Sequence, residues 1–218
     1  MPRHDLIASL DFLNGEMSLL KHPFYQEWTA GTLSVERLRT YAAQYYRQVA
    51  TFPRYLSAMH SRCDDLATRQ ELLENLIEEE RGAENHPELW LRFAEALGLA
   101  REEVLAAEPM PATNALVATF TRLSRESPLQ SGFAALYVYE SQVRDVADAK
   151  IDGLRRFYGI TDEAGLKFFT VHREADLYHS QAVAKMIERN RGSAPDDGTT
   201  LEAGRVALQA VWSLLDAI

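Results

Sequence analysis

The sequence predicts an all-α fold, a single bundle of roughly seven or eight helices. Apolar residues recur at spacings of three and four along most of the 218 residues, which is the period of a helix that buries one face. No run alternates between apolar and polar residues as a half-buried strand would. Proline, glycine and capping residues divide this pattern into segments of helical length. A chain of this length can bury one large core.

The composition excludes several classes of protein. The net charge of −9 comes with no cluster of basic residues, so a nucleic-acid partner is not expected. No stretch approaches the roughly 18 apolar residues of a membrane span, and Asp5 and Asp11 precede any long apolar run, so we expect no signal peptide. Cys63 is the only cysteine, which excludes an intrachain disulfide and fits a reducing compartment. We therefore expect a soluble, cytoplasmic protein.

The first third of the chain should form one short and one long helix. The first covers Leu6–Leu20 and ends before Pro23, because the residue that precedes a proline avoids helical angles. A short connecting segment, 24–28, follows. Ser34 then caps a long helix, which Pro53 interrupts or restarts. The inward face of this helix is rich in tyrosines that we interpret as core: Tyr41, Tyr45, Tyr46 and Tyr55.

The next helix, capped by Asp65, has a carboxylate on its apolar face. Spacings of four and three define its inward stripe: Leu72, Leu76, Glu79, Ala83 and His86. The flanking Glu78 and Glu80 point about 100° to either side, toward water. Because a proline follows His86, the helix should bend or end there, and a further helix covers 88–97.

Two helices follow in the middle of the chain. The first covers Thr113–Arg125, after a linker that contains two prolines. Ser127, followed by proline, starts the second, which runs to Gly159 and places Glu140 among apolar residues on its buried face. Lys150 lies about 80° around from Glu140, so its ammonium group could point inward or reach solvent.

A long helix that begins at residue 161 or 162 and ends near 190 has the densest set of ionisable groups. His172, Asp176 and His179 fall within about 60° of one another on it, on a stripe shared with apolar residues. Two imidazoles and a carboxylate are costly to bury unless a partner satisfies them. Ordinary core histidines bonded to a neighbouring aspartate are the alternative.

The C-terminal region is the only one with a linker-like composition. Residues 192–199 are rich in glycine and polar residues, and 199–202 fits a capping box for a last helix that ends at Ile218. We therefore divide the chain into a main domain, 1–191, and a linker with a C-terminal helix, 192–218, that packs on the same domain.

Together, three helices bear three carboxylates and three imidazoles on faces that should be apolar. Inward Glu and His side chains from several helices are how di-iron and di-manganese bundles hold their metals, whereas separate structural ion pairs would require several costly burials. The number of ligands also argues against zinc. The predicted ligands of a dinuclear site are Glu79, His86, Glu140, His172, Asp176 and His179.

These motifs resemble a known family. The spacings Glu-x6-His and His-x3-Asp-x2-His, the lone glutamate between them and the phrase Asn-His-Pro-Glu-Leu-Trp at 85–90 are similar to the haem-oxygenase-like di-iron oxidases. Within these, the chain most resembles the group named after the Chlamydia protein associating with death domains, and more distantly the thiaminase-like and pyrroloquinoline-quinone-synthesis proteins. The resemblance covers residues 4 to about 190 and implies a seven-helix haem-oxygenase-like fold.

The resemblance implies a specific activity. Members of that group are para-aminobenzoate synthases that consume their own tyrosine to make this folate precursor, which implies two metal ions (Fe/Fe or Fe/Mn), O2, an external reductant and about one turnover per chain. By position in the motifs, Tyr25 matches the sacrificed tyrosine and Lys150 matches the amino donor. Tyr41 and Tyr139 match tyrosines that relay radicals.

Other interpretations stay open from the sequence. The same metal site could oxidise an external fatty acid or amino acid, or the chain could be a protein-interaction module without catalysis. Thiaminase-like relatives use a cysteine nucleophile, but Cys63 has no inward carboxylate at helical spacing, so we interpret it as structural. A homodimer, the electron donor and the choice between iron and manganese are not determined by these patterns.

Overall fold

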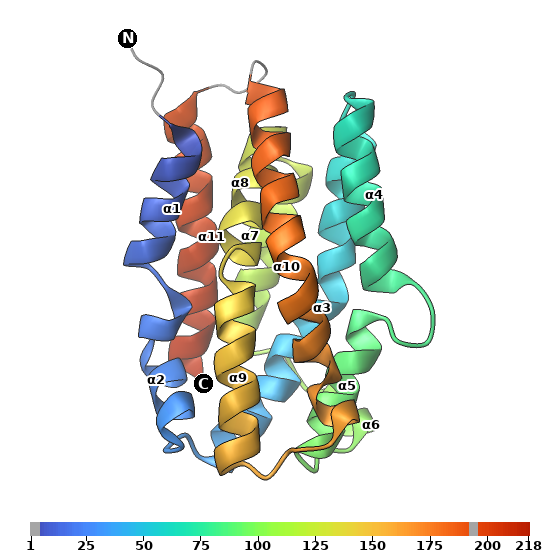
Figure 1. Ribbon diagram of the computed structural model, residues 1–218, viewed down its shortest axis with the longest axis vertical. Helices are drawn as coiled ribbons and strands as arrows, with labels where there is room; N and C mark the ends of the chain where they lie inside the picture. The colour runs from blue at the N-terminus through green and yellow to red at the C-terminus, as the bar shows by residue number, and fades with distance from the viewer. Residues whose placement is uncertain (1–4, 192–195) are drawn as a thin grey trace.

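The computed structural model describes residues 5–191 and 196–218, apart from the side chains of 174–179. All regular secondary structure in these residues is helical, so the predicted all-α class is confirmed. Most helices run along the long axis of one bundle (Figure 1). In chain order they are α1 (Leu6–Glu16), η1 (Leu19–Lys21), α2 (Pro23–Ala30), α3 (Val35–Arg62), α4 (Leu66–Glu80), α5 (His86–Ala96), α6 (Arg101–Ala106), α7 (Pro111–Arg125), α8 (Leu129–Glu140), α9 (Val143–Phe157), α10 (Glu163–Asn190) and α11 (Asp197–Ala217).

The segment that precedes the long helix α3 is itself helical, where the sequence predicted only a connection. The Nδ1 atom of His22 accepts the backbone N–H of Phe24 and so caps α2, and Pro23 needs no donor at the first helical position. Gly31, with φ of 71°, ends the helix in the left-handed conformation that glycine tolerates. Tyr25 therefore lies on a short, capped helix, buried from solvent.

Helix α3 is continuous through Pro53, so the predicted interruption there is wrong. A proline removes one backbone hydrogen bond from a helix interior. Here Pro53 is itself buried, and Phe52, Tyr55 and Leu56 beside it are buried too. Packing of this apolar face outweighs the lost bond, and it keeps the tyrosines of α3 on one straight stripe.

The single helix predicted from Ser127 to Gly159 is instead two helices, α8 and α9, which separate at Ser141 and Gln142. The Gln142 side chain bonds to distant groups: its Oε1 accepts the N–H of Leu19 at 2.7 Å, and its Nε2 donates to Asn14 Oδ1 at 3.2 Å. These contacts come from the N-terminal region and are invisible to local periodicity. As a result, Glu140 and Lys150 lie on different helices.

The last helix, α11, begins at Asp197, because Asp196 and not Thr199 provides its cap. It lies against α8, α7 and α1, and the indole of Trp212 donates to the carbonyl of Met17. Near its end, Asp216 lies 3.0 Å from Nε2 of His22. The C-terminal helix thus supports the N-terminal cap of α2. The short helix α6 was not predicted.

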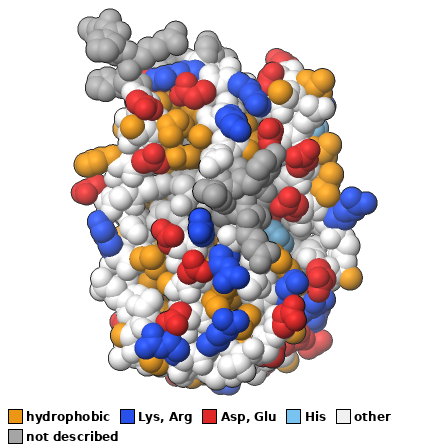
Figure 2. Space-filling model, viewed as in Figure 1, with side chains coloured by type: hydrophobic (Ala, Val, Ile, Leu, Met, Phe, Trp, Pro, Cys, Tyr) orange, Lys and Arg blue, Asp and Glu red, His pale blue; other side chains and the backbone are white. Residues whose placement is uncertain are grey.

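The surface charges and the aromatic core of the bundle also bear on its function. On the face shown in Figure 2, acidic and basic side chains are interspersed and no continuous basic patch forms. No described helix combines the length and apolar character that crossing a bilayer requires. Inside, α2, α3, α5 and α10 meet in a cluster of aromatic rings that includes Trp28, Tyr41, Trp90 and Phe169.

Candidate metal centre and the tyrosine pocket beside it

Glu79 and His86 come from two helices and not from one face of a single helix, as the stripe predicted. α4 ends at Glu80, and the chain turns at Gly82, whose φ is 79°. The side chain of Asn85 then caps α5 by accepting the N–H of Glu88, so that His86 is the first residue of α5. The turn brings His86 back against the last turn of α4, and Glu79 is buried.

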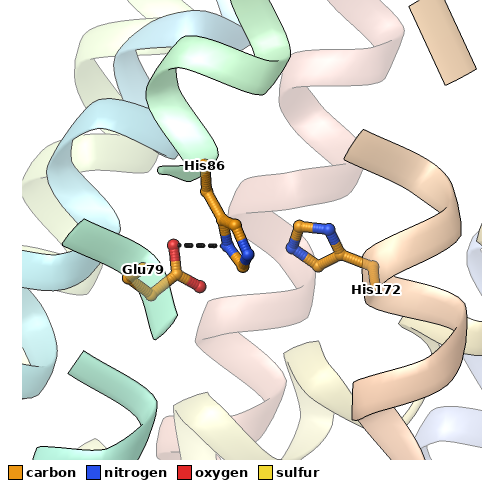
Figure 3. Close-up of side chains that lie close together, drawn as sticks. All are labelled: Glu79, His86 and His172. Atoms are coloured by element: carbon orange, nitrogen blue, oxygen red, sulfur yellow. Dashed lines mark ion pairs between the residues drawn. The ribbon is translucent and has the colours of Figure 1, made fainter. Parts of the chain in front are cut away.

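Three donor groups from α4, α5 and α10 face one another (Figure 3). Oε2 of Glu79 lies 2.8 Å from Nδ1 of His86, yet the two atoms lack the alignment of a hydrogen bond. The imidazole rings of His86 and His172 have centroids 4.3 Å apart. One ligand atom from each of the three residues lies within 4.8 Å of the others. Such an arrangement suits groups that face a shared ion.

His172 is oriented by its own helix. Its Nδ1 lies 2.6 Å from the backbone carbonyl of Phe168, one turn earlier on α10. Because a carbonyl oxygen only accepts, this contact requires a hydrogen on Nδ1, and in that neutral tautomer the lone pair that a metal ligand needs is on Nε2. A backbone carbonyl that fixes the tautomer in this way is the usual support of a metal-binding histidine.

Glu140 is the next predicted ligand. It is the last residue of α8 and is 4% exposed. Its Oε1 accepts a hydrogen bond of 2.9 Å from Nδ2 of Asn75, which lies one turn before Glu79 on α4. Asn75 thus joins the two carboxylate-bearing helices, a role that the sequence did not reveal. The side chains of Asp176 and His179 lie outside the described residues.

The donor set of Glu79, His86 and His172 fits a metal ion. One buried carboxylate and two imidazoles are hard or intermediate ligands of the kind that bind iron, manganese and zinc. Nδ1 of His86 forms an ion-pair contact with Glu79 but has no aligned hydrogen bond, and a cation bound by both side chains would satisfy this buried nitrogen. The predicted ligands from α4, α5 and α10 are therefore brought together.

Beside this centre, Lys150 of α9 points into the aromatic core. Its Nζ donates to the hydroxyl of Tyr41 at 2.8 Å, and that hydroxyl lies 3.5 Å from the hydroxyl of Tyr25. The rings that surround Nζ have centroids 5.1–5.9 Å away: Tyr25, Trp28, Tyr41, Tyr45, Trp90 and Phe169. Burial among them lowers the pKa of Lys150 to about 7, because desolvation disfavours the ammonium form.

Four buried tyrosines line up from this lysine toward Glu140. The hydroxyls of Tyr45 and Tyr139 are 2.7 Å apart, and the ring of Tyr45 lies 5.1 Å from that of Tyr41. Burial raises the pKa of Tyr45 to about 12 and raises the pKa values of Tyr25, Tyr41 and Tyr139 as well. All four are therefore neutral phenols.

A partly open space of about 40 Å³ joins the two regions. His172 lines it from the metal side, and Tyr25, Tyr45, Tyr139 and Lys150 line it from the other. This volume holds a few molecules of the size of water. The sequence predicted Tyr45 as ordinary core, and its register alone could not show that its hydroxyl meets Tyr139.

The cysteine of the thiaminase-like alternative does not belong to this site. Cys63 is buried just after the end of α3 and does not line the cavity. Desolvation raises the pKa of its thiol, whereas a cysteine nucleophile requires a lowered one. The sequence-based interpretation of Cys63 as structural agrees with this environment.

Fold and site together define a metal-dependent oxidative enzyme of the haem-oxygenase-like class. Residues 39–212 match the family described as iron-containing redox enzyme, and the chain belongs to this family. The resemblance seen in the motifs is thereby confirmed. In fold, the chain is similar to a TenA homologue from Pseudomonas syringae, with a TM-score of 0.83 at 17% identity, over 97% of this chain and 89% of that one.

Two relatives with higher sequence identity are both 4-aminobenzoate synthases. The chain is 45% identical over 209 residues to the 4-aminobenzoate synthase of Nitrosomonas europaea, which covers 92% of this chain and 85% of the relative. It is 43% identical over 213 residues to the 4-aminobenzoate synthase of Chlamydia muridarum, covering 98% of this chain and 89% of the relative.

Proposed function

We propose that this protein is a 4-aminobenzoate synthase that builds its product from its own Tyr25. The supporting observation is that an amine and a phenol already line one pocket. The Lys150 amine and the Tyr25 hydroxyl both contact the hydroxyl of Tyr41, at 2.8 Å and 3.5 Å. The similarity to 4-aminobenzoate synthases of two organisms supports the same activity.

The product and Tyr25 share a carbon skeleton. In tyrosine, Cβ is attached to the ring opposite the phenol oxygen, as the carboxylate of 4-aminobenzoate is opposite its amine. The conversion breaks the Cα–Cβ bond, oxidises Cβ to a carboxylate and replaces the phenol oxygen with nitrogen. Tyr25 is held for this change between α2 and α3, 3% exposed, with Nζ of Lys150 5.5 Å from its ring centroid.

Lys150 is suited to be the amino donor. A nitrogen nucleophile must be unprotonated when it reacts, and the pKa of Lys150, lowered to about 7 by burial, makes much of it neutral near physiological pH. The hydrogen bond to Tyr41 orients the amine, and the surrounding rings bury it. No charged group is needed to shift this pKa, because desolvation is sufficient.

Glu79, His86, Glu140 and His172, with Asp176 and His179, would hold the metal ions, as Fe/Fe or Fe/Mn. With O2 and an external reductant, such ions would supply the oxidising equivalents that cleavage of Tyr25 consumes. The residues around them keep the cavity small: Phe168, Phe169 and Val146 line it beside His172. An external aromatic or fatty-acid substrate would have to displace these side chains, which favours Tyr25 as the substrate.

Intact mass and product yield test the proposal. The reduced, iron- and manganese-loaded protein is exposed to O2, and we expect at most about one 4-aminobenzoate per chain, with a matching loss of mass that peptide mapping places at Tyr25. Protein made with ring-labelled tyrosine should release labelled product. Tyr25→Phe should bind metal and release none, whereas Tyr55→Phe, which removes another buried hydroxyl, should behave like wild type.

The opposite outcome would identify a conventional oxidase. Many product molecules per chain from an added small molecule, or a normal yield from Tyr25→Phe, would show that Tyr25 is not consumed.

A further inference from the structure

Tyr45 contacts both halves of the tyrosine pocket. Its hydroxyl lies 2.7 Å from that of Tyr139, and its ring is tilted by 33° over that of Tyr41, with centroids 5.1 Å apart. Among the described residues, no hydrogen bond or ring contact joins Tyr139 directly to Tyr41. Tyr45 is therefore the physical connection between them.

The two tyrosines that Tyr45 joins belong to opposite ends of the site. Tyr139 precedes Glu140 on α8 and lines the same cavity as His172. Tyr41 contacts Lys150 and Tyr25. The order along the contacts is thus metal ligands, Tyr139, Tyr45, Tyr41 and then Tyr25.

We propose that Tyr45 is a redox-active residue that passes one electron and one proton at a time between Tyr41 and Tyr139. The proposal rests on the function proposed above, because it assigns the route by which Tyr25 is oxidised. Its oxidant, by class, is a one-electron oxidant derived from O2 at the metal centre. The net effect of the relay through Tyr45 is that one electron and one proton move from Tyr41 to Tyr139.

The steps balance in atoms and electrons. A Tyr139 phenoxyl radical takes an electron and the hydroxyl proton of Tyr45 across their hydrogen bond, so Tyr139 becomes a phenol again and Tyr45 becomes the radical. Tyr45 then takes one electron from the neighbouring ring of Tyr41 and one proton from the Tyr41 hydroxyl. Moving the proton with the electron avoids a buried phenolate, which would be strongly destabilised in this apolar pocket.

The hydroxyl of Tyr45 is the group to remove, and Tyr55 provides a matched control. Tyr45→Phe keeps the ring that packs on Tyr41 and Trp90 but ends proton transfer. Tyr55→Phe on the same helix also deletes a buried hydroxyl, which otherwise bonds to Gln48 Oε1 at 3.1 Å. Both variants leave one buried polar partner unsatisfied, so their effects on stability should be similar.

The first experiment combines product yield with electron paramagnetic resonance of the metal-loaded protein after mixing with O2. In Tyr45→Phe we expect normal metal content, a rate of 4-aminobenzoate formation lower by about tenfold or more, and a phenoxyl signal that persists at Tyr139 and disappears in Tyr45→Phe/Tyr139→Phe. Tyr55→Phe should match wild type in all three. A normal rate for Tyr45→Phe would overturn the relay.

A second experiment detects the radical itself. 3-Aminotyrosine, which is easier to oxidise than tyrosine, is incorporated in place of Tyr45 or of Tyr55. We expect an aminotyrosyl radical signal after O2 only when the analogue replaces Tyr45. No signal there, or an equal signal at both positions, would overturn the proposal. If wild type forms no 4-aminobenzoate at all, the proposed function fails instead, so the two failures are distinguishable.

Discussion

The two ends of the site stabilise buried polar groups in opposite ways. At the metal end, Glu79, His86 and His172 come from three helices with ligand atoms within 4.8 Å of one another. At the other end, Lys150 is surrounded by aromatic rings and its pKa falls to about 7. The first end gathers ionisable groups that a cation would neutralise, whereas burial at the second end favours the neutral form of the amine. In the proposed function, the first end would bind metal and the second would provide a neutral amine.

Removing one metal-facing carboxylate should have the largest effect. Glu79→Gln keeps the shape of the side chain but replaces a charged ligand with a weak amide ligand, so we expect loss of most bound iron or manganese and of all product. Metal analysis after loading measures this. Glu78→Gln and Glu80→Gln, at exposed neighbours on the same helix, serve as controls and should keep wild-type metal content. Equal metal content in all three variants would contradict a metal centre at Glu79.

At the aromatic end, Lys150→Met should abolish product formation and yet stabilise the fold. The pKa of Lys150 is lowered from 10.5 to about 7, so the unfolded chain binds a proton that the folded protein releases between these values. Stability of wild type therefore rises with pH from about 7 to about 10.5. Lys150→Met lacks the buried ammonium group and should unfold with a free energy higher by about 2–4 kcal/mol at pH 7 or below.

Urea unfolding of both proteins at several pH values measures this difference. The gap between variant and wild type should shrink as the pH rises from about 7 to about 10.5, because neutral Lys150 is no longer penalised. A gap that does not change with pH would show that Lys150 is not buried as a titrating amine. In the proposed function, the residue that lowers stability is thus also the one that supplies the reacting amine.

A third effect concerns the pH dependence of the reaction. If the Lys150 amine reacts in its neutral form, the rate of 4-aminobenzoate formation should rise up to about tenfold per pH unit at acidic pH and level off near pH 7. Bound metal ions would move this midpoint lower, because nearby positive charge disfavours the ammonium form. Single-turnover rates between about pH 5 and 8 measure it. A rate that falls as the pH rises would contradict the role of Lys150 as donor.

Local periodicity predicted the groups that face inward but not the partners they meet. The register of α4 correctly separated buried Glu79 from exposed Glu78 and Glu80, because one helix face is enough to decide burial. The helical period could not decide whether the side chain of Lys150, at the edge of a helix face, pointed inward. That depended on the break between α8 and α9, which is caused by contacts of Gln142 with residues more than a hundred positions away.

The same limit applies to Tyr45 and Asn75. The sequence placed Tyr45 in the core and did not single out Asn75, and the functions of both depend on atoms from α8: the hydroxyl of Tyr139 and the carboxylate of Glu140. A single sequence specifies the direction of a side chain through the helical period. It does not specify which distant helix the side chain meets.

The smallest expected effect lies outside both ends, at the cap that holds Tyr25 in place. His22 accepts the N–H of Phe24, and its other nitrogen lies 3.0 Å from the largely exposed carboxylate of Asp216. His22→Ala should lower the free energy of unfolding by about 1 kcal/mol through loss of the cap, measured by urea denaturation. Product yield per chain should fall less than in Lys150→Met, because α2 is loosened but no reacting group is lost.

Two further variants separate the cap from the ion pair. His22→Asn keeps a side chain that caps helices well and should recover most of the lost stability. Asp216→Asn removes only a solvent-screened contact and should change stability by a few tenths of a kcal/mol. If His22→Asn were as unstable as His22→Ala while Asp216→Asn was equally damaged, the contact with α11, and not the cap of α2, would be what positions Tyr25.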